Sequence, residues 1–138
     1  MRMLANINNH HGDGEYSACW GYTAPDGREY GILGCAKGTA FIDITDTNNI
    51  YEAAYLPGLN LPSCCREMKV FSHYAYVVAD GIASGLQIID LQYLPDSVHL
   101  VNTYFYGDFT MGHTISIEGP YLFINAGDYN IGGLFVLD

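Results

Sequence analysis

Short apolar runs, separated by Gly, Pro, Asp or Ser, recur along the chain and predict β-strands. Strands are typically short, rich in β-branched and aromatic residues, and bounded by turn-forming residues. Three of the runs end in one shared motif, in which apolar residues are closed by an aspartate: 39–43 (TAFID), 86–90 (LQIID) and 134–138 (LFVLD). The closing aspartates lie 47 and 48 residues apart. One structural unit is therefore repeated three times.

Each repeat holds two more apolar runs upstream of this motif, and the first two repeats hold another run after it. The upstream runs cover 19–22 and 30–34, 68–71 and 75–79, and 115–117 and 121–125, and the following runs cover 51–56 and 99–104. Four strands in about 45 residues is the size of one β-propeller blade. The sequence predicts an all-β fold of β-propeller blades with four antiparallel strands each, in about three repeats of 45–48 residues.

The repeats define one β-propeller segment over 1–138, with units at approximately 16–58, 65–106 and 112–138. The third unit stops before a fourth strand, and the apolar segment 2–7 is a candidate closing outer strand for it. Closed propellers typically have four to eight blades. We therefore expect either a part of a longer chain or a homo-oligomer in which copies complete one ring.

The charge of the chain limits its partners. The 138 residues carry a formal net charge of −10 with only five Lys and Arg. Nucleic acids and anionic membrane surfaces bind through cationic groups, so neither fits this chain. A cation, a basic protein or a neutral ligand fits better. No apolar run approaches the length of a transmembrane helix, and no signal peptide is visible at the N-terminus.

Four cysteines lack the paired spacing of a structural zinc site: Cys19, Cys35, Cys64 and Cys65. We expect ordinary buried thiols, and one disulfide stays open as the alternative if the protein is exported.

Several ordered motifs resemble the LVIVD-repeat propellers, in particular the "choice-of-anchor B" proteins of bacterial surfaces. The motifs are Trp20-Gly21-Tyr22, Gly27 to Tyr30 (GREY), Gly38 to Asp46 (GTAFIDITD), Arg66 to Val70 (REMKV) and the repeated L-x-(I/V)-(I/L)-D ending. The resemblance spans about residues 16 to 138. It implies a β-propeller outside the cell or at its surface, and it implies no established reaction or catalytic set.

Three polar positions depart from the pattern of that family. Ala18 stands where the family usually has Asp, Arg66-Glu67 replaces an Arg-Asp pair, and His113-Thr114 replaces a His-Asn pair. All three lie at the start of a first blade strand, which lines the central channel in propellers. We therefore expect Arg66, Glu67, His113 and Thr114 to be candidate binding residues at the channel mouth.

The segment before the first blade holds the densest set of ionisable ligands. His10, His11, Asp13 and Glu15 could together hold a transition metal, and the acids could help to bind calcium. The spacing matches no EF-hand or zincin pattern, and a solvated loop is the simpler interpretation. No cofactor is indicated beyond this divalent cation.

The remaining candidates have structural interpretations beside functional ones. His113 is either a general base or ligand, or a hydrogen-bonded structural histidine. Arg66 and Glu67 should point to opposite faces of a strand, with a structural ion pair to another blade favoured over ligand binding. Asp43, Asp90 and Asp138 recur at strand ends, where an aspartate accepts hydrogen bonds from turn N–H groups.

These observations favour a non-catalytic extracellular binding or scaffold module whose ligand is a protein or a glycan. One alternative is an enzyme, metal-dependent if a cation is held, with a site at the channel mouth. The other alternative is a structural subunit that assembles through blade edges, because open sheet edges can accept strands from a neighbour.

Overall fold

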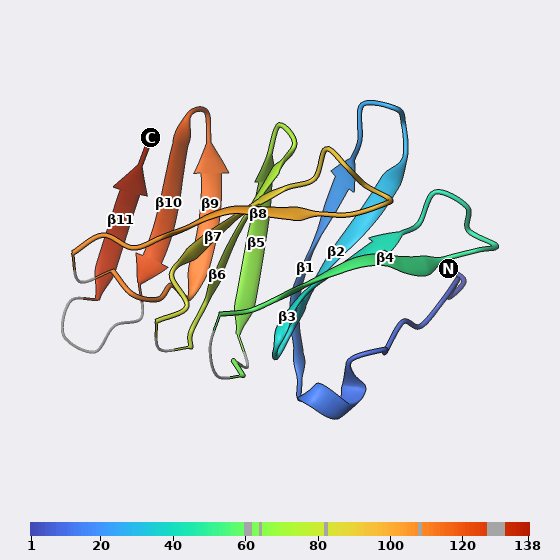
Figure 1. Ribbon diagram of the computed structural model, residues 1–138, viewed down its shortest axis with the longest axis horizontal. Coiled ribbons are helices and arrows are strands. Elements are labelled where there is room, and N and C mark those ends of the chain that lie inside the picture. Colours follow the sequence, from blue (N-terminus) through green and yellow to red (C-terminus); the bar gives the residue numbers. More distant parts are fainter. Residues whose placement is uncertain (60–61, 64, 82, 108, 127–131) are drawn as a thin grey trace.

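Eleven strands form three separate antiparallel sheets in the computed structural model (Figure 1), which describes residues 1–59, 62–63, 65–81, 83–107, 109–126 and 132–138. Blade 1 consists of β1 (Tyr16–Thr23), β2 (Glu29–Cys35), β3 (Gly38–Asp43) and β4 (Tyr51–Pro57). Blade 2 consists of β5 (Arg66–Phe71), β6 (Tyr74–Ala79), β7 (Leu86–Asp90) and β8 (His99–Tyr104). Blade 3 consists of β9 (Thr114–Glu118), β10 (Tyr121–Ala126) and β11 (Gly133–Leu137). The predicted all-β, blade-like fold is confirmed.

The strands of each blade are joined in a simple meander, so every strand pairs with its neighbour in the chain. The repeated motif supplies β3, β7 and β11, which is the third strand of each blade. The aspartates that close the first two copies cap the turns that follow. The Thr45 N–H donates to Asp43 Oδ1 at 2.9 Å, and the Gln92 N–H donates to Asp90 Oδ1 at 2.8 Å. The predicted capping role of these aspartates is confirmed.

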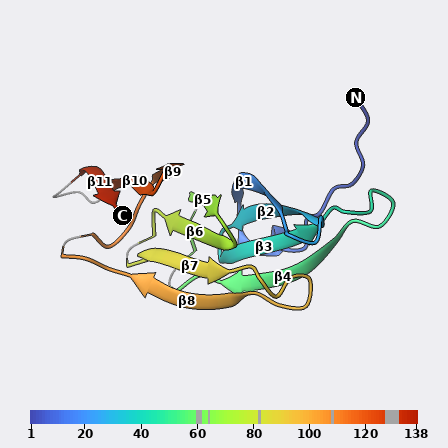
Figure 2. The ribbon, with the colours of Figure 1, turned by 90° about the horizontal axis from the view of Figure 1, so that it is seen from above.

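The blades stand side by side with their first strands together. Seen from above, β1, β5 and β9 follow one another along one side, and β4 and β8 lie on the opposite side (Figure 2). This order of strands from inside to outside is that of propeller blades around an axis. Blade 3 is turned away from blade 2, so these two sheets diverge from their first strands outward (Figure 2).

Two of the three hydrophobic clusters among the described residues lie between the blades, at interfaces that we call seams. The seam between blades 1 and 2 buries Tyr30, Phe41, Met68 and Ile89 almost completely. The seam between blades 2 and 3 buries a second cluster, which includes Phe109 and Ile124. Blades 1 and 3 alone would each expose one of these apolar faces and blade 2 would expose two, and stacking removes them from water.

Blade 3 has three strands, and β11 is its edge strand within the described residues. Residues 2–7, the candidate closing strand, form no strand and lie near blade 1, where Ile7 packs against the cluster of Cys35, Ala40 and Ile42. The only described helix is the single 3₁₀ turn η1 (His11–Asp13). The described residues hold no helix of the length and apolarity that crossing a bilayer requires.

Candidate functional site

Three potential metal ligands from two blades meet at one end of the seam between blades 2 and 3. Cys65 directly precedes β5, Asp80 directly follows β6, and His113 directly precedes β9. One donor atom from each of the three lies within 4.8 Å of the other two. Within the described part of the chain, this is the one group of three or more His, Cys, Asp or Glu donors gathered so closely.

Backbone hydrogen bonds position all three residues. The Asp80 N–H donates to the Cys65 carbonyl at 3.0 Å, which extends the pairing of β5 and β6 by one residue. The His113 N–H donates to the Asn125 carbonyl at 2.8 Å, which extends the pairing of β9 and β10. Ser63 fixes the backbone of Cys65, because its hydroxyl accepts from the Cys65 N–H and donates to the Cys65 carbonyl.

The two blades approach closely enough to form this cluster because residue 112 is glycine. A Cβ at Gly112 would lie 2.7 Å from Ile124 Cγ2 and 3.1 Å from Val78 Cβ. The Gly112 N–H donates to the Ala79 carbonyl across the seam at 3.3 Å. A larger residue would push the strand that carries His113 away from Asp80.

His113 and Asp80 form a short hydrogen-bonded pair within the cluster. His113 Nδ1 lies 2.7 Å from Asp80 Oδ2, and the two side chains are 50% and 30% exposed. An ionised carboxylate only accepts hydrogen bonds, so Nδ1 carries the shared proton and the ring has a fixed orientation. The other carboxylate oxygen, Asp80 Oδ1, is buried and has no hydrogen-bond partner among the described residues.

Arg66 is one of the expected channel-mouth residues, but it turns into the protein. It is only 4% exposed, and its guanidinium donates to the Cys35 carbonyl at 3.2 Å and to Gln87 Oε1 at 3.3 Å. The ion pair with another blade that the sequence favoured is absent among the described residues, where neutral acceptors take the place of a carboxylate. Burial lowers the pKa of this guanidinium from its ordinary value.

Glu67 lies on the face of β5 opposite to Arg66, as the alternation of side chains along a strand requires. Its Oε1 lies 2.9 Å from Lys69 Nζ, and that ammonium lies 4.2 Å from the centre of the Trp20 ring on β1. Thr114 is exposed at the first position of β9. Of the four expected residues, His113 therefore joins the cluster, and Arg66 and Glu67 are held by other partners.

The expected ligands before blade 1 divide between several interactions. His10 Nε2 lies 2.9 Å from Glu52 Oε2, and the His10 ring stacks on Tyr55 at 4.0 Å. Asp13 pairs with Lys37 at 2.6 Å. Lys37 thus neutralises one carboxylate of the expected set. His11 and Glu15 are exposed, and neither belongs to a close donor group in the described residues.

The cysteines occupy different environments. Cys35 is buried, as expected, whereas Cys19 is exposed on β1, so the expectation of a buried thiol is wrong there. The alternation of β1 turns Cys19 away from the seam, whereas its neighbour Ala18 packs against the seam cluster. Cys65 is half-buried in the cluster, and Cys64 lies outside the described residues.

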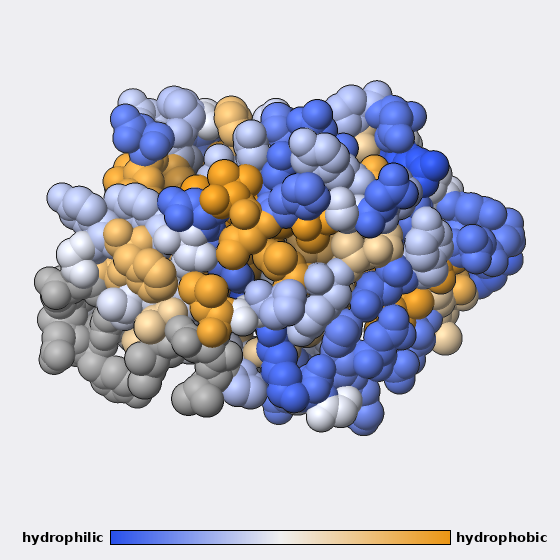
Figure 3. Space-filling view, in the orientation of Figure 1, coloured by the Kyte–Doolittle hydropathy of each residue, from blue (hydrophilic) through white to orange (hydrophobic). Residues whose placement is uncertain are grey.

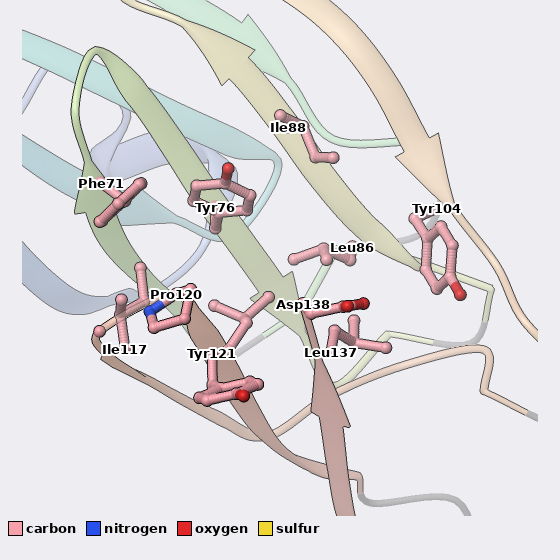
Figure 4. A pocket seen from close by; sticks show the side chains of 12 residues that line it. Phe71, Tyr76, Leu86, Ile88, Tyr104, Ile117, Pro120, Tyr121, Leu137 and Asp138 are labelled. Atoms are coloured by element: carbon pink, nitrogen blue, oxygen red, sulfur yellow. The ribbon is translucent and has the colours of Figure 1, made fainter.

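A second feature of this seam is an apolar groove of about 210 Å³ where blades 2 and 3 diverge. We call it the seam groove. It is lined by Phe71, Tyr76, Leu86, Ile88, Tyr104, Ile117, Gly119, Pro120, Tyr121, Leu122, Leu137 and Asp138 (Figure 4). The sequence pattern gives no signal for this groove, because the groove depends on the angle between two sheets.

Comparisons with protein families, curated proteins and solved structures found no match for this chain. The seam between blades 2 and 3 holds both the cluster of potential metal ligands and the seam groove.

Proposed function

We propose that this chain is a non-catalytic binding module that holds a basic protein segment in the seam groove. The observation that carries this proposal is the lining of the groove. Phe71 and Tyr121 lie at its mouth with 51% and 50% of their surface exposed, and Tyr76 and Tyr104 form its wall. Aromatic residues that remain accessible in a concave site are typical anchors of protein interfaces.

The surface around the groove is apolar over a wide area. Phe105 and Tyr106, which follow β8, are 47% and 69% exposed. Apolar side chains gather over the middle and left of the face that Figure 3 shows, whereas its right side is mostly hydrophilic. Extended exposed apolar patches on a folded protein mark interaction surfaces.

Charge favours a basic partner. The chain has 15 Asp and Glu against five Lys and Arg. The carboxylate of Asp138 lines the groove, and the exposed Glu118 precedes the turn at Gly119. A negative field attracts cationic segments and accelerates their encounter with the site. The partner is therefore a protein segment in which apolar anchors alternate with Lys or Arg.

We also propose that the chain belongs to the LVIVD-repeat propellers and works outside the cell or at its surface. The support is the motif that ends the third strand of each of the three blades. Expression of the full-length gene product in its host, followed by surface labelling, would test the location. Retention of the protein inside the cell would contradict this part of the proposal.

A fluorescent peptide of alternating lysine and phenylalanine tests the binding proposal by fluorescence anisotropy. We expect saturable binding, and at least about tenfold weaker binding by Tyr121→Ser, because a buried aromatic anchor contributes more than about 1.4 kcal/mol. Tyr93→Ser is the matched control, since Tyr93 is 49% exposed and lies outside the groove. It should bind like the unchanged protein.

Two further peptides sharpen the test. Replacing lysine by glutamate in the peptide should abolish binding, because the acidic protein repels the new charges. Replacing phenylalanine by serine should abolish binding, because the aromatic anchor is lost. Equal binding of the glutamate peptide, or binding unaffected by Tyr121→Ser, would overturn the proposal. So would a glycan-array signal that Tyr121→Ser removes, because the groove would then be a sugar site.

Assembly through blade edges is a second candidate function, and the edge strand β11 favours it. Leu134 and Val136 on this strand are 67% and 52% exposed. Light scattering at increasing concentration should show association that Val136→Lys prevents, because a charge on an edge strand blocks strand addition. The protein staying monomeric, or the same loss with Val101→Lys on β8, would contradict assembly through β11.

A further inference from the structure

We propose that Cys65, Asp80 and His113 form a binding site for one divalent transition-metal ion, with Zn²⁺ as its natural occupant. The site lies at the end of the seam between blades 2 and 3 and does not depend on the seam groove. None of its three residues lines that groove.

The donor set fits zinc. A thiolate sulfur, an imidazole nitrogen and a carboxylate oxygen are the three ligand types that Zn²⁺ takes in proteins. Hard ions such as Ca²⁺ and Mg²⁺ require several oxygen ligands, and the cluster offers only one carboxylate. A three-residue set leaves one position of a tetrahedral ion open to solvent, and the half-exposed His113 places that position at the surface.

The geometry is close to a bound arrangement. Bonds to zinc are about 2.0–2.3 Å long, and tetrahedral angles place two donors of one ion roughly 3.3–3.8 Å apart. The three donor atoms already lie within 4.8 Å of one another. Rotations of exposed or half-buried side chains cover that difference, because the backbone hydrogen bonds of Asp80 and His113 hold both main chains in place.

The ion would take the place of the proton between His113 Nδ1 and Asp80 Oδ2. Their present separation of 2.7 Å is that of a hydrogen bond. When the ion binds, the neutral imidazole moves its proton from Nδ1 to Nε2, and the thiol of Cys65 releases one proton to solvent as the thiolate binds. About one proton is therefore released for each ion.

The second observation that points to a cation is the buried oxygen Asp80 Oδ1. It has no hydrogen-bond partner among the described residues. A buried carboxylate oxygen without a partner is unfavourable, and a cation bound to the same carboxylate compensates for it. Buried unsatisfied polar atoms in native proteins commonly indicate a bound ion or water.

Titration of chelator-treated protein tests the site directly. Calorimetry with ZnCl₂ should show one saturable site per chain, with heats in buffers of different ionisation enthalpy that report release of about one proton. Titration with CoCl₂ should produce the absorption bands of tetrahedral cobalt together with a thiolate-to-cobalt charge-transfer band. Absence of saturable uptake of either ion would overturn the proposal.

Variants locate the ion. Cys65→Ser should remove the charge-transfer band, and Asp80→Asn or His113→Asn should weaken Zn²⁺ binding at least about tenfold. Cys19→Ser and His73→Asn are matched controls, because both residues lie outside the cluster, and they should bind like the unchanged protein. Circular dichroism checks that each variant is folded, and the two single changes at Asp80 and His113 provide independent readings.

His10→Asn distinguishes this site from the loop before blade 1. If that change abolished uptake of Zn²⁺ while His113→Asn left it unchanged, the ion would be in the loop and the proposal would be overturned. Peptide binding by Tyr121→Ser tests the seam groove, and metal uptake by His113→Asn tests the metal site. Failure of one proposal therefore does not decide the other.

Discussion

The hydroxyl of Ser17 bonds both backbone polar groups of Arg66. Ser17 Oγ accepts from the Arg66 N–H at 3.0 Å and donates to the Arg66 carbonyl at 2.9 Å. Ser17 lies on β1 and Arg66 begins β5, so one small side chain connects the first strands of two blades. Because β1 and β5 belong to different sheets, no backbone ladder joins them here. The Ser17 hydroxyl satisfies the two polar groups of Arg66 in place of a neighbouring strand.

Ser17→Ala should therefore destabilise the protein. The change leaves the N–H and the carbonyl of Arg66 without their partner in a partly buried seam, which costs about 1–3 kcal/mol of unfolding free energy. Urea unfolding followed by tyrosine and tryptophan fluorescence measures this loss. Ser116→Ala, at an exposed position on β9, is the control and should change the midpoint little. A midpoint for Ser17→Ala equal to that of Ser116→Ala would contradict the bridging role.

Gly34 faces the same contact, and we expect it to tolerate no side chain. A Cβ there would lie 2.6 Å from Ser17 Oγ and 2.7 Å from the Arg66 carbonyl oxygen. Gly34→Ala should cost about 1–3 kcal/mol, since backbone on the facing strand must move. Gly21→Ala is matched to it, because a Cβ at Gly21 meets nothing within 4 Å. Equal unfolding temperatures for the two variants would contradict this prediction, because the seam would then accommodate a methyl group at Gly34 without loss of stability.

Cys35 and Cys19 should differ strongly in reactivity. Burial, with the nearby charge of Glu52, raises the pKa of Cys35 to about 11, so its thiol stays protonated in mildly alkaline buffer. The thiolate is the reactive form, and Cys19 is exposed. Iodoacetamide at about pH 8 should label Cys19 quickly and Cys35 slowly, as peptide mass spectrometry measures. Denatured protein should lose the difference, and equal rates in the folded protein would contradict it.

Stability should fall in acid partly through Asp43. Burial of Asp43 favours the neutral carboxyl, but hydrogen bonds from Thr45, the charge of Arg28 and the hydroxyl of Tyr51 outweigh it and hold its pKa below the ordinary 3.8. The folded state therefore binds the proton more weakly than the unfolded state. The stabilisation is complete above the unfolded pKa and is lost as the pH falls through the folded pKa.

Urea unfolding at about pH 6 and about pH 3 measures this contribution. Asp43→Asn should lose less stability between the two pH values than the unchanged protein. The pKa of Asp13 is also lowered, through its hydrogen bond from Lys37, so some acid sensitivity should persist in the variant. An unchanged difference between the two pH values would show that Asp43 contributes nothing to it.

The repeat predicts the strands well because each blade buries apolar residues of the same strands against a neighbouring sheet. The motif at 86–90 coincides with β7, and the run at 75–79 differs from β6 by one residue. Local pattern and turn residues determine these elements. The segment 2–7 shows the limit. Its apolar residues match a strand pattern, but a strand needs a partner, and pairing across the molecule leaves no signal in the segment itself.

The cluster at the seam was only partly predictable for a related reason. The position at the head of a strand predicts His113 as a site residue, and the same rule points to Arg66, which is buried. Pairing the predicted strands of blade 2 as a hairpin would have placed Asp80 beside Cys65, since the two residues flank β5 and β6. The meeting of Asp80 with His113 depends on how two sheets approach each other, and no local pattern encodes that distance.

Among the described residues, blade 2 alone has a sheet packed against both of its faces, so the two interfaces differ in how they can open. The apolar cluster that includes Phe41 and Met68 joins it to blade 1, and the cluster that includes Val78 and Ile124 joins it to blade 3. The two clusters share no residue. Blade 3 can therefore separate from blade 2 while the apolar cluster between blades 1 and 2 stays buried. Unfolding of blade 2, in contrast, exposes both clusters to solvent.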